Sequence, residues 1–168
     1  MSHRIPSASL PTALAFALPF VAVLAVGPLA RAALSDAVVA AFRGKIVLSR
    51  AAVAPGAADK DTIAKLKAAQ LAEVVGTSTD DGEVWRFHYA AFLKKAGNVA
   101  LKLRYVSGEQ DRQQVAESVI PIPDVDSVVL TGDLTISERQ GLERGKAYVL
   151  QLVNDKGDVV AKTSAIFK

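Results

Sequence analysis

The stretch Glu83–Lys94, EVWRFHYAAFLK, decides the fold class of this chain. Successive side chains of a β-strand point to opposite faces. One face of this stretch would carry the apolar set Trp85, Phe87, Tyr89, Ala91 and Leu93. The other would carry Arg86, His88, Ala90, Phe92 and Lys94. The pattern therefore predicts a strand with one buried face, and Phe92 indicates that the other face is partly covered, by a helix or a partner.

Outward from this stretch, strand and turn signals dominate. We expect about eight short strands, over 45–50, 71–77, 83–94, 98–106, 114–122, 127–136, 146–154 and 158–167. Asp80-Asp81-Gly82 and Asp155-Lys156-Gly157 read as hairpin turns, and Gly132 as a bulge. Residues 59–70 have helical spacing, whereas no structure is predicted for 33–43. The pattern favours a sandwich or barrel.

The strand at 98–106 is expected to pair with the strand at 83–94. A three-residue loop, Lys95-Ala96-Gly97, aligns the two apolar faces, and Gly97 would take the left-handed conformation. In that register the paired residues are Leu93 with Val99, Ala91 with Leu101, Tyr89 with Leu103, and Phe87 with Tyr105.

The segment from Leu142 to Leu152, LERGKAYVLQL, carries a family resemblance. It resembles the E–F corner and F strand of immunoglobulin-like and fibronectin type III-like sandwiches. The resemblance implies a tyrosine corner, in which the hydroxyl of Tyr148 bonds to the backbone just upstream. It also implies an immunoglobulin-like antiparallel β-sandwich of about seven to eight strands with one short helix. The whole chain is similar to uncharacterised secreted bacterial β-sandwich proteins.

Residues 1–32 have the features of a secretory signal peptide. Arg4 precedes an apolar run over 13–26, and Ala30-Arg31-Ala32 matches the small-x-small cleavage pattern. An uncleaved anchor is the alternative, but a spanning helix needs about 20 apolar residues and Pro19 interrupts this run. We expect cleavage before Ala33, export to the periplasm or beyond, no remaining membrane anchor, and a single domain over 33–168.

Composition narrows the function classes. Without the leader, 18 of the 20 basic residues remain against 17 acidic ones, a net charge of about +1. This balance gives no support for nucleic-acid or anionic-membrane binding. The chain has no cysteine, which excludes disulfides, thiolate metal sites, thiol nucleophiles and a lipid-modified cysteine. A cysteine-free exported domain fits a bacterial envelope protein.

His88 is the only histidine after the leader. Catalysis would need a nucleophile and an orienting carboxylate, and in the expected register His88 faces Arg104 with no carboxylate beside it. We therefore expect an ordinary sheet-face histidine. The cationic face Arg86, His88, Lys102 and Arg104 is the candidate site for an anionic ligand. The alternative is a solvated face whose charges discourage edge association.

Three further groups have simpler explanations. The acidic turns Asp80–Glu83 and Asp155–Asp158 offer calcium ligands, but Asp and Gly are also what tight turns require. An aromatic stripe formed by Trp85, Phe87, Tyr89 and Tyr105 fits the core better than a ligand platform.

We expect an exported non-enzymatic binding or structural module whose partner is an unknown protein or glycan, with no cofactor and no metal. One alternative is a carbohydrate-active hydrolase or accessory with paired Asp/Glu residues. Another is an inhibitor or chaperone that acts through a strand edge.

Overall fold

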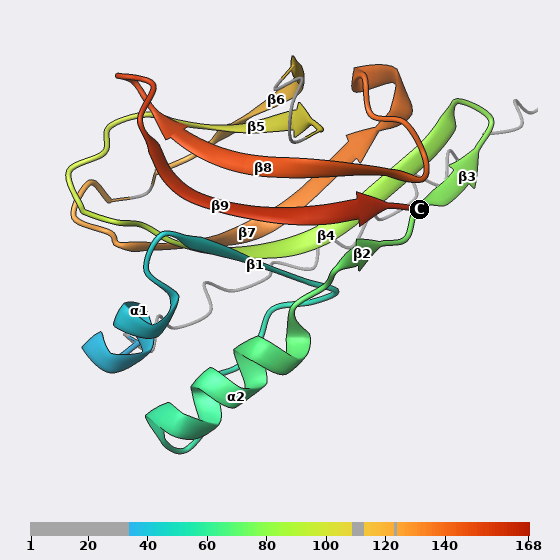
Figure 1. Ribbon diagram of the computed structural model, residues 1–168. Helices are drawn as coiled ribbons and strands as arrows, with labels where there is room; N and C mark the ends of the chain where they lie inside the picture. Colours follow the sequence, from blue (N-terminus) through green and yellow to red (C-terminus); the bar gives the residue numbers. More distant parts are fainter. Residues whose placement is uncertain (1–33, 109–112, 123) are drawn as a thin grey trace, which may run out of the picture. The chain divides into compact units, whose positions relative to one another are not determined.

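The computed structural model describes residues 34–108, 113–122 and 124–168, so the expected signal peptide lies outside the described residues. Two helices, α1 (Asp36–Phe42) and α2 (Asp59–Ala69), accompany nine strands (Figure 1). The strands are β1 (Lys45–Ser49), β2 (Glu73–Val74), β3 (Thr77–Thr79), β4 (Gly82–Phe92), β5 (Leu101–Ser107), β6 (Gln113–Ile120), β7 (Val129–Ser137), β8 (Lys146–Asn154) and β9 (Val159–Phe167). A 3-10 helix, η1 (Glu138–Gln140), follows β7. The mainly β class is confirmed.

Helix α1 occupies a segment for which the sequence predicted no structure. The Ser35 hydroxyl caps it by accepting a hydrogen bond from the Val38 amide at 3.4 Å. The ring of Phe42 stacks on Phe92, with 5.1 Å between centroids. Leu66 of α2 belongs to the same buried cluster. The two helices therefore cover Phe92, which explains an aromatic residue on the otherwise polar face of β4.

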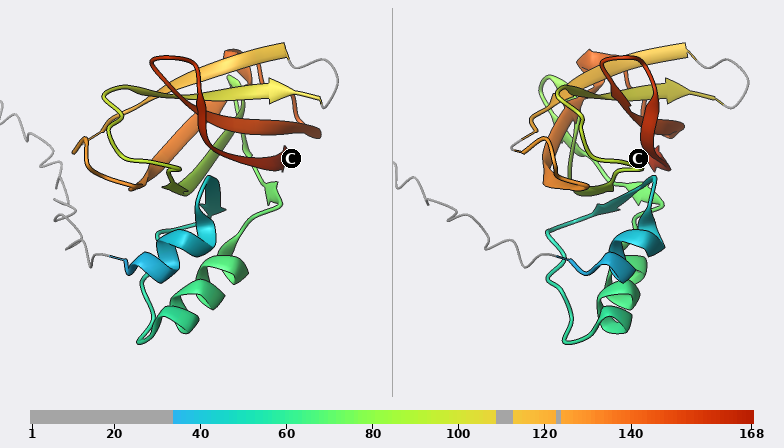
Figure 2. Two further views of the ribbon diagram at one scale, coloured as in Figure 1. Left: turned by 60° about the vertical axis from the view of Figure 1, so that its left-hand side comes forward. Right: turned by 90° about the vertical axis from the view of Figure 1, so that its left-hand side faces the viewer.

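The strands form one curled mixed sheet instead of the two antiparallel layers expected (Figure 2). Its order is β7-β4-β1-β9-β8-β5-β6. Strand β1 runs antiparallel to β4 but parallel to β9. Parallel and antiparallel pairing occur together because α2 is inserted after β1. The chain then returns as β2, which pairs with β9, and as β3, which pairs with β4, so both lie in line with β1 between those two strands.

The predicted hairpin between 83–94 and 98–106 is wrong. Strand β4 pairs with β1, β3 and β7, whereas β5 pairs with β6 and β8. The segment after β4 continues beside the residues that precede β7 instead of turning back along β4, since the Leu93 amide bonds to the Val128 carbonyl and the Gly97 amide to the Val125 carbonyl. Gly97 does adopt positive φ, as predicted. Alternation identified the buried face correctly but not the neighbouring strand.

The core contains the predicted aromatic stripe. Phe167, on β9, is fully buried at its centre. Its ring makes edge-to-face contacts at 5.5 to 6.2 Å between centroids with Trp85, Phe87, Tyr105 and Tyr148. Such edge-to-face pairs add stabilisation beyond area burial. The reading of these aromatic residues as core is confirmed.

Several local predictions can be checked directly. The hydroxyl of Tyr148 accepts a 2.7 Å hydrogen bond from the Glu143 amide, the contact that a tyrosine corner requires. Both predicted hairpin turns join antiparallel strands, β3 to β4 and β8 to β9. Gly132 forms no bulge, because β4 and β7 pair without a register shift. The structure instead places Gly132 against the ring of Tyr89.

Candidate functional site

The predicted cationic face is divided between two parts of the sheet. Arg86 and His88 lie on β4, and Lys102 and Arg104 lie on β5. Strands β1, β9 and β8 separate β4 from β5. The four side chains were grouped on the assumption that these two strands are neighbours, and the sheet order does not bring them together.

His88 has a carboxylate partner that the sequence reasoning missed. Its Nδ1 lies 2.9 Å from Oδ1 of Asp133, which is directly opposite on β7. Ser49 lies opposite His88 on β1, so serine, histidine and aspartate follow one another across three strands. The Ser49 hydroxyl, however, donates to the Ala51 carbonyl at 2.7 Å and its residue is 3 % exposed. The Ser49 hydroxyl is therefore bonded to a backbone carbonyl and not to the imidazole, so this row has no activated nucleophile.

Lys102 and Arg104 share one acidic partner. Lys102 Nζ lies 2.8 Å from Glu117 Oε1, and Arg104 Nε lies 3.2 Å from Oε2. The hydrogen bond from Lys102 is the main cause that lowers the pKa of Glu117, and Arg104 adds to it. Glu117 is therefore ionised at neutral pH and fixes the Arg104 side chain through one of its nitrogens.

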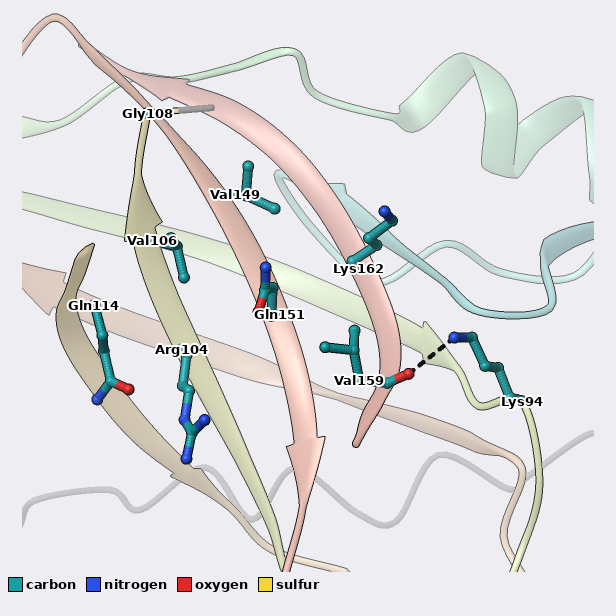
Figure 3. A pocket seen from close by; sticks show the side chains of 9 residues that line it. All are labelled: Lys94, Arg104, Val106, Gly108, Gln114, Val149, Gln151, Val159 and Lys162. Carbon is teal, nitrogen blue, oxygen red and sulfur yellow. Dashed lines mark hydrogen bonds between the residues drawn. The ribbon is translucent and has the colours of Figure 1, made fainter. Parts of the chain in front are cut away.

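A depression of about 620 Å³ lies on the outer face of β5, β6, β8 and β9, next to Arg104 (Figure 3). We call it the outer groove. Its lining consists of cationic, amide and small apolar residues: Lys94, Arg104, Val106, Gly108, Gln114, Val149, Gln151, Val159 and Lys162. Three of these residues are cationic and none is acidic. Among the predicted site residues, only Arg104 belongs to it.

The cations of the outer groove come from separate elements. Lys94 follows β4, and its Nζ donates to the Val159 carbonyl at 2.9 Å, which anchors this side chain at the groove wall. Lys162 lies on β9 and Arg104 on β5. The Arg104 side chain is 35 % exposed, so solvent and ligands can reach it. Sequence reasoning missed Lys94 and Lys162 because it did not place β8 and β9 beside β5.

A second, smaller depression of about 240 Å³ lies where α1 and α2 begin. Small and apolar residues dominate its lining, and Asp59 is the one ionisable residue there. It has no pair of groups that could act together as acid and base.

The side chains of the two acidic turns are bonded to other groups of this chain. Asp81 pairs with Arg139. Glu83, 8 % exposed, accepts from the Ser78 hydroxyl and from Arg144 at 3.1 Å. In the turn after β8, the Asn154 side chain accepts from the Asp158 amide at 2.8 Å. Within the described ranges no three His, Asp or Glu side chains are grouped to hold a metal ion.

Comparisons with known proteins give no name to this arrangement. No helix in the described part of the chain is long and apolar enough to cross a bilayer. The chain matches no protein-family model, no curated protein and no solved structure.

Proposed function

We propose that this protein is an exported, non-enzymatic binding module that takes an anionic ligand in its outer groove. The observation that carries the proposal is the charge of the described lining residues, of which three are cationic and none is acidic; the Glu117 carboxylate borders them and engages Arg104 only through its Nε. Converging cations bind carboxylate, sulfate or phosphate groups through charge-assisted hydrogen bonds. The side-chain amide of Gln151 adds a neutral donor and acceptor for the rest of the ligand, whereas the Gln114 amide donates to Glu117 at 3.4 Å.

The chemistry of the outer groove favours binding over catalysis. Its described lining residues include no carboxylate, histidine, serine or threonine, and so none of the usual general bases and hydroxyl nucleophiles. A hydrolase with paired carboxylates would need two acids across one cleft. Neither depression described above has more than one acidic residue in its lining.

The proposed compartment, periplasmic or extracellular, rests on the signal-peptide features of residues 1–32. The proposed immunoglobulin-like relationship rests on the tyrosine corner formed by Tyr148 and Glu143. It has to accommodate the parallel pairing of β1 with β9, which a purely antiparallel sandwich does not have.

A second candidate function is supported by the sheet edges. Among the described residues, the outer edges of β6 and β7 pair with no other strand. Neither strand contains Lys, Arg or Pro, the residues that often protect edges. An inhibitor or chaperone could use such an edge to add a strand from its client. Arg substitution at Val119, 76 % exposed on β6, should then block client binding and leave anion binding unchanged.

Calorimetric titration of the purified protein tests the anion proposal. The probes are hexaglutamate, oligogalacturonate and neutral dextran, at low salt because ion pairs weaken as salt rises. At least one anion should bind and dextran should not. The variant Arg104→Gln/Lys162→Gln should lose at least about fivefold in affinity.

A matched variant, Lys60→Gln/Lys65→Gln, removes the same charge from exposed positions of α2. It should bind the anion as the parent does. An equal loss in both variants would mean that net charge governs binding, and would contradict the assignment to the groove.

A further inference from the structure

The outer groove contains a row of three residues across three strands. Lys162 on β9 pairs with Gln151 on β8, and Gln151 pairs with Arg104 on β5. Residues paired in this way point to the same face of a sheet, and neighbouring strands lie about 4.8 Å apart. A cation, an amide and a second cation thus succeed one another, and the two cationic residues start about 10 Å apart; Glu117 of β6 is the next residue in line, opposite Arg104.

We propose that this row binds an extended peptide segment in which one residue separates two acidic residues. The inference rests on the anion binding proposed above and specifies the ligand. In an extended chain, side chains at positions i and i+2 lie on one side, about 7 Å apart. This spacing is shorter than the roughly 10 Å between the two cationic residues. The long side chains of Arg104 and Lys162 can bend toward each other to make up the difference, so that each meets one carboxylate.

Gln151 lies between the two cations, where the peptide group of the middle residue would be. A glutamine amide both donates and accepts, so it matches a backbone N–H and C=O. The Arg104 side chain is held in position to contact one carboxylate of the peptide, because its Nε donates a 3.2 Å hydrogen bond to Glu117. The terminal guanidinium nitrogens, which have no partner among the described residues, are then directed to the ligand.

The remaining lining favours a peptide over a glycan. None of the residues known to line the groove in the described ranges is aromatic, whereas sugar rings are commonly held by stacking on aromatic rings. Instead, Val106, Val149 and Val159 offer small apolar contacts beside the polar row. These contacts suit the aliphatic parts of peptide side chains.

Two isomeric, fluorescently labelled peptides test the spacing. The peptide GEAEG has acidic residues at i and i+2, and GEEAG has the same composition with adjacent acids. Fluorescence polarisation should show at least about threefold tighter binding of GEAEG, the effect of one additional ion pair. The variant Gln151→Met should reduce this preference, and Lys162→Gln should abolish it. The control Lys156→Gln, in the turn before β9, should keep it.

Each contrary result has a distinct meaning. Equal affinity for the two isomers overturns the spacing rule while anion binding stands. Binding of oligogalacturonate without either peptide overturns the peptide assignment. Absence of binding to any anion overturns the proposed function itself. The chain has acid–x–acid segments of its own, among them Asp124-Val125-Asp126, with Val125 48 % exposed. Self-association that Asp124→Asn/Asp126→Asn removes would replace the foreign peptide by a second copy of this chain.

Discussion

The ring of Tyr89 on β4 lies directly against the backbone of Gly132 on β7, its partner in the strand pair. A Cβ at position 132 would come within 3.0 Å of Cε1 and of the hydroxyl of Tyr89. The glycine is therefore required by the close approach of an aromatic ring, and no bulge accompanies it.

We expect Gly132→Ala to destabilise the protein by about 1 to 3 kcal/mol, the usual cost of overpacking. Urea denaturation followed by tryptophan fluorescence measures the change. The control is Thr131→Ala, at the exposed neighbouring position, which should stay within about 0.5 kcal/mol of the parent. Equal stability of Gly132→Ala and the parent would show that the ring can move aside.

The two buried tyrosine hydroxyls in the core should respond differently to removal. Tyr148→Phe loses the 2.7 Å hydrogen bond from the Glu143 amide and leaves that amide without its partner. We expect a loss of about 1 kcal/mol or more in the free energy of unfolding. Tyr105 is fully buried, and its hydroxyl has no hydrogen-bond partner among the described residues. Tyr105→Phe should therefore be neutral or stabilising in the same denaturation assay.

Tyr105 also predicts a dependence on alkaline pH. Burial raises the pKa of Tyr105 from 10.0 to about 12, against the opposing effect of the Ser118 side chain. The folded state then binds this proton more tightly than the unfolded state. The contribution of Tyr105 to the free energy of unfolding is fully present below pH 10. It is lost as the pH rises from about 10 through 12, a fall of about 2 to 3 kcal/mol in total.

Denaturation series across this pH range should show that fall, and Tyr105→Phe should reduce it. A residual slope is expected from Tyr89, whose pKa is raised by burial and then by the negative charge of Asp133. An unchanged slope in Tyr105→Phe would contradict the assignment.

The stacked pair Phe42 and Phe92 makes a further prediction. Phe42→Ala removes the α1 side of a buried cluster, and such truncations cost about 3 to 5 kcal/mol. We expect a lower melting temperature and faster proteolysis near α1. Ala41→Gly, at an exposed position of the same helix, controls for helix propensity, which costs about 1 kcal/mol. Similar behaviour of the two variants would mean that the stacking contributes little.

The sequence predicted which residues form strands, and which face of a strand enters the core, better than it predicted which strands are neighbours. The alternation in Glu83–Lys94 correctly identified the face that enters the main core, and Phe92 correctly indicated a covering element. It did not show that His88 and Ala90, on the other face, are buried as well. The partner of β4 could not be read in this way, because an apolar face pairs equally well with any strand of the same core. The candidate site depended on that pairing. Lys162, Gln151 and Arg104 lie 11 and 47 positions apart along the chain, so only the sheet order shows that they form one row.

Strand β9 hydrogen-bonds to β1 on one side and to β8 on the other. The earliest strand of the sheet therefore acquires its second neighbour only from the final residues of the sequence. While the chain is still being synthesised, Phe167 is not yet available to complete the aromatic core. Closure of the sheet therefore depends on β9, and a chain without this strand leaves β1 and β8 without the neighbour that they share.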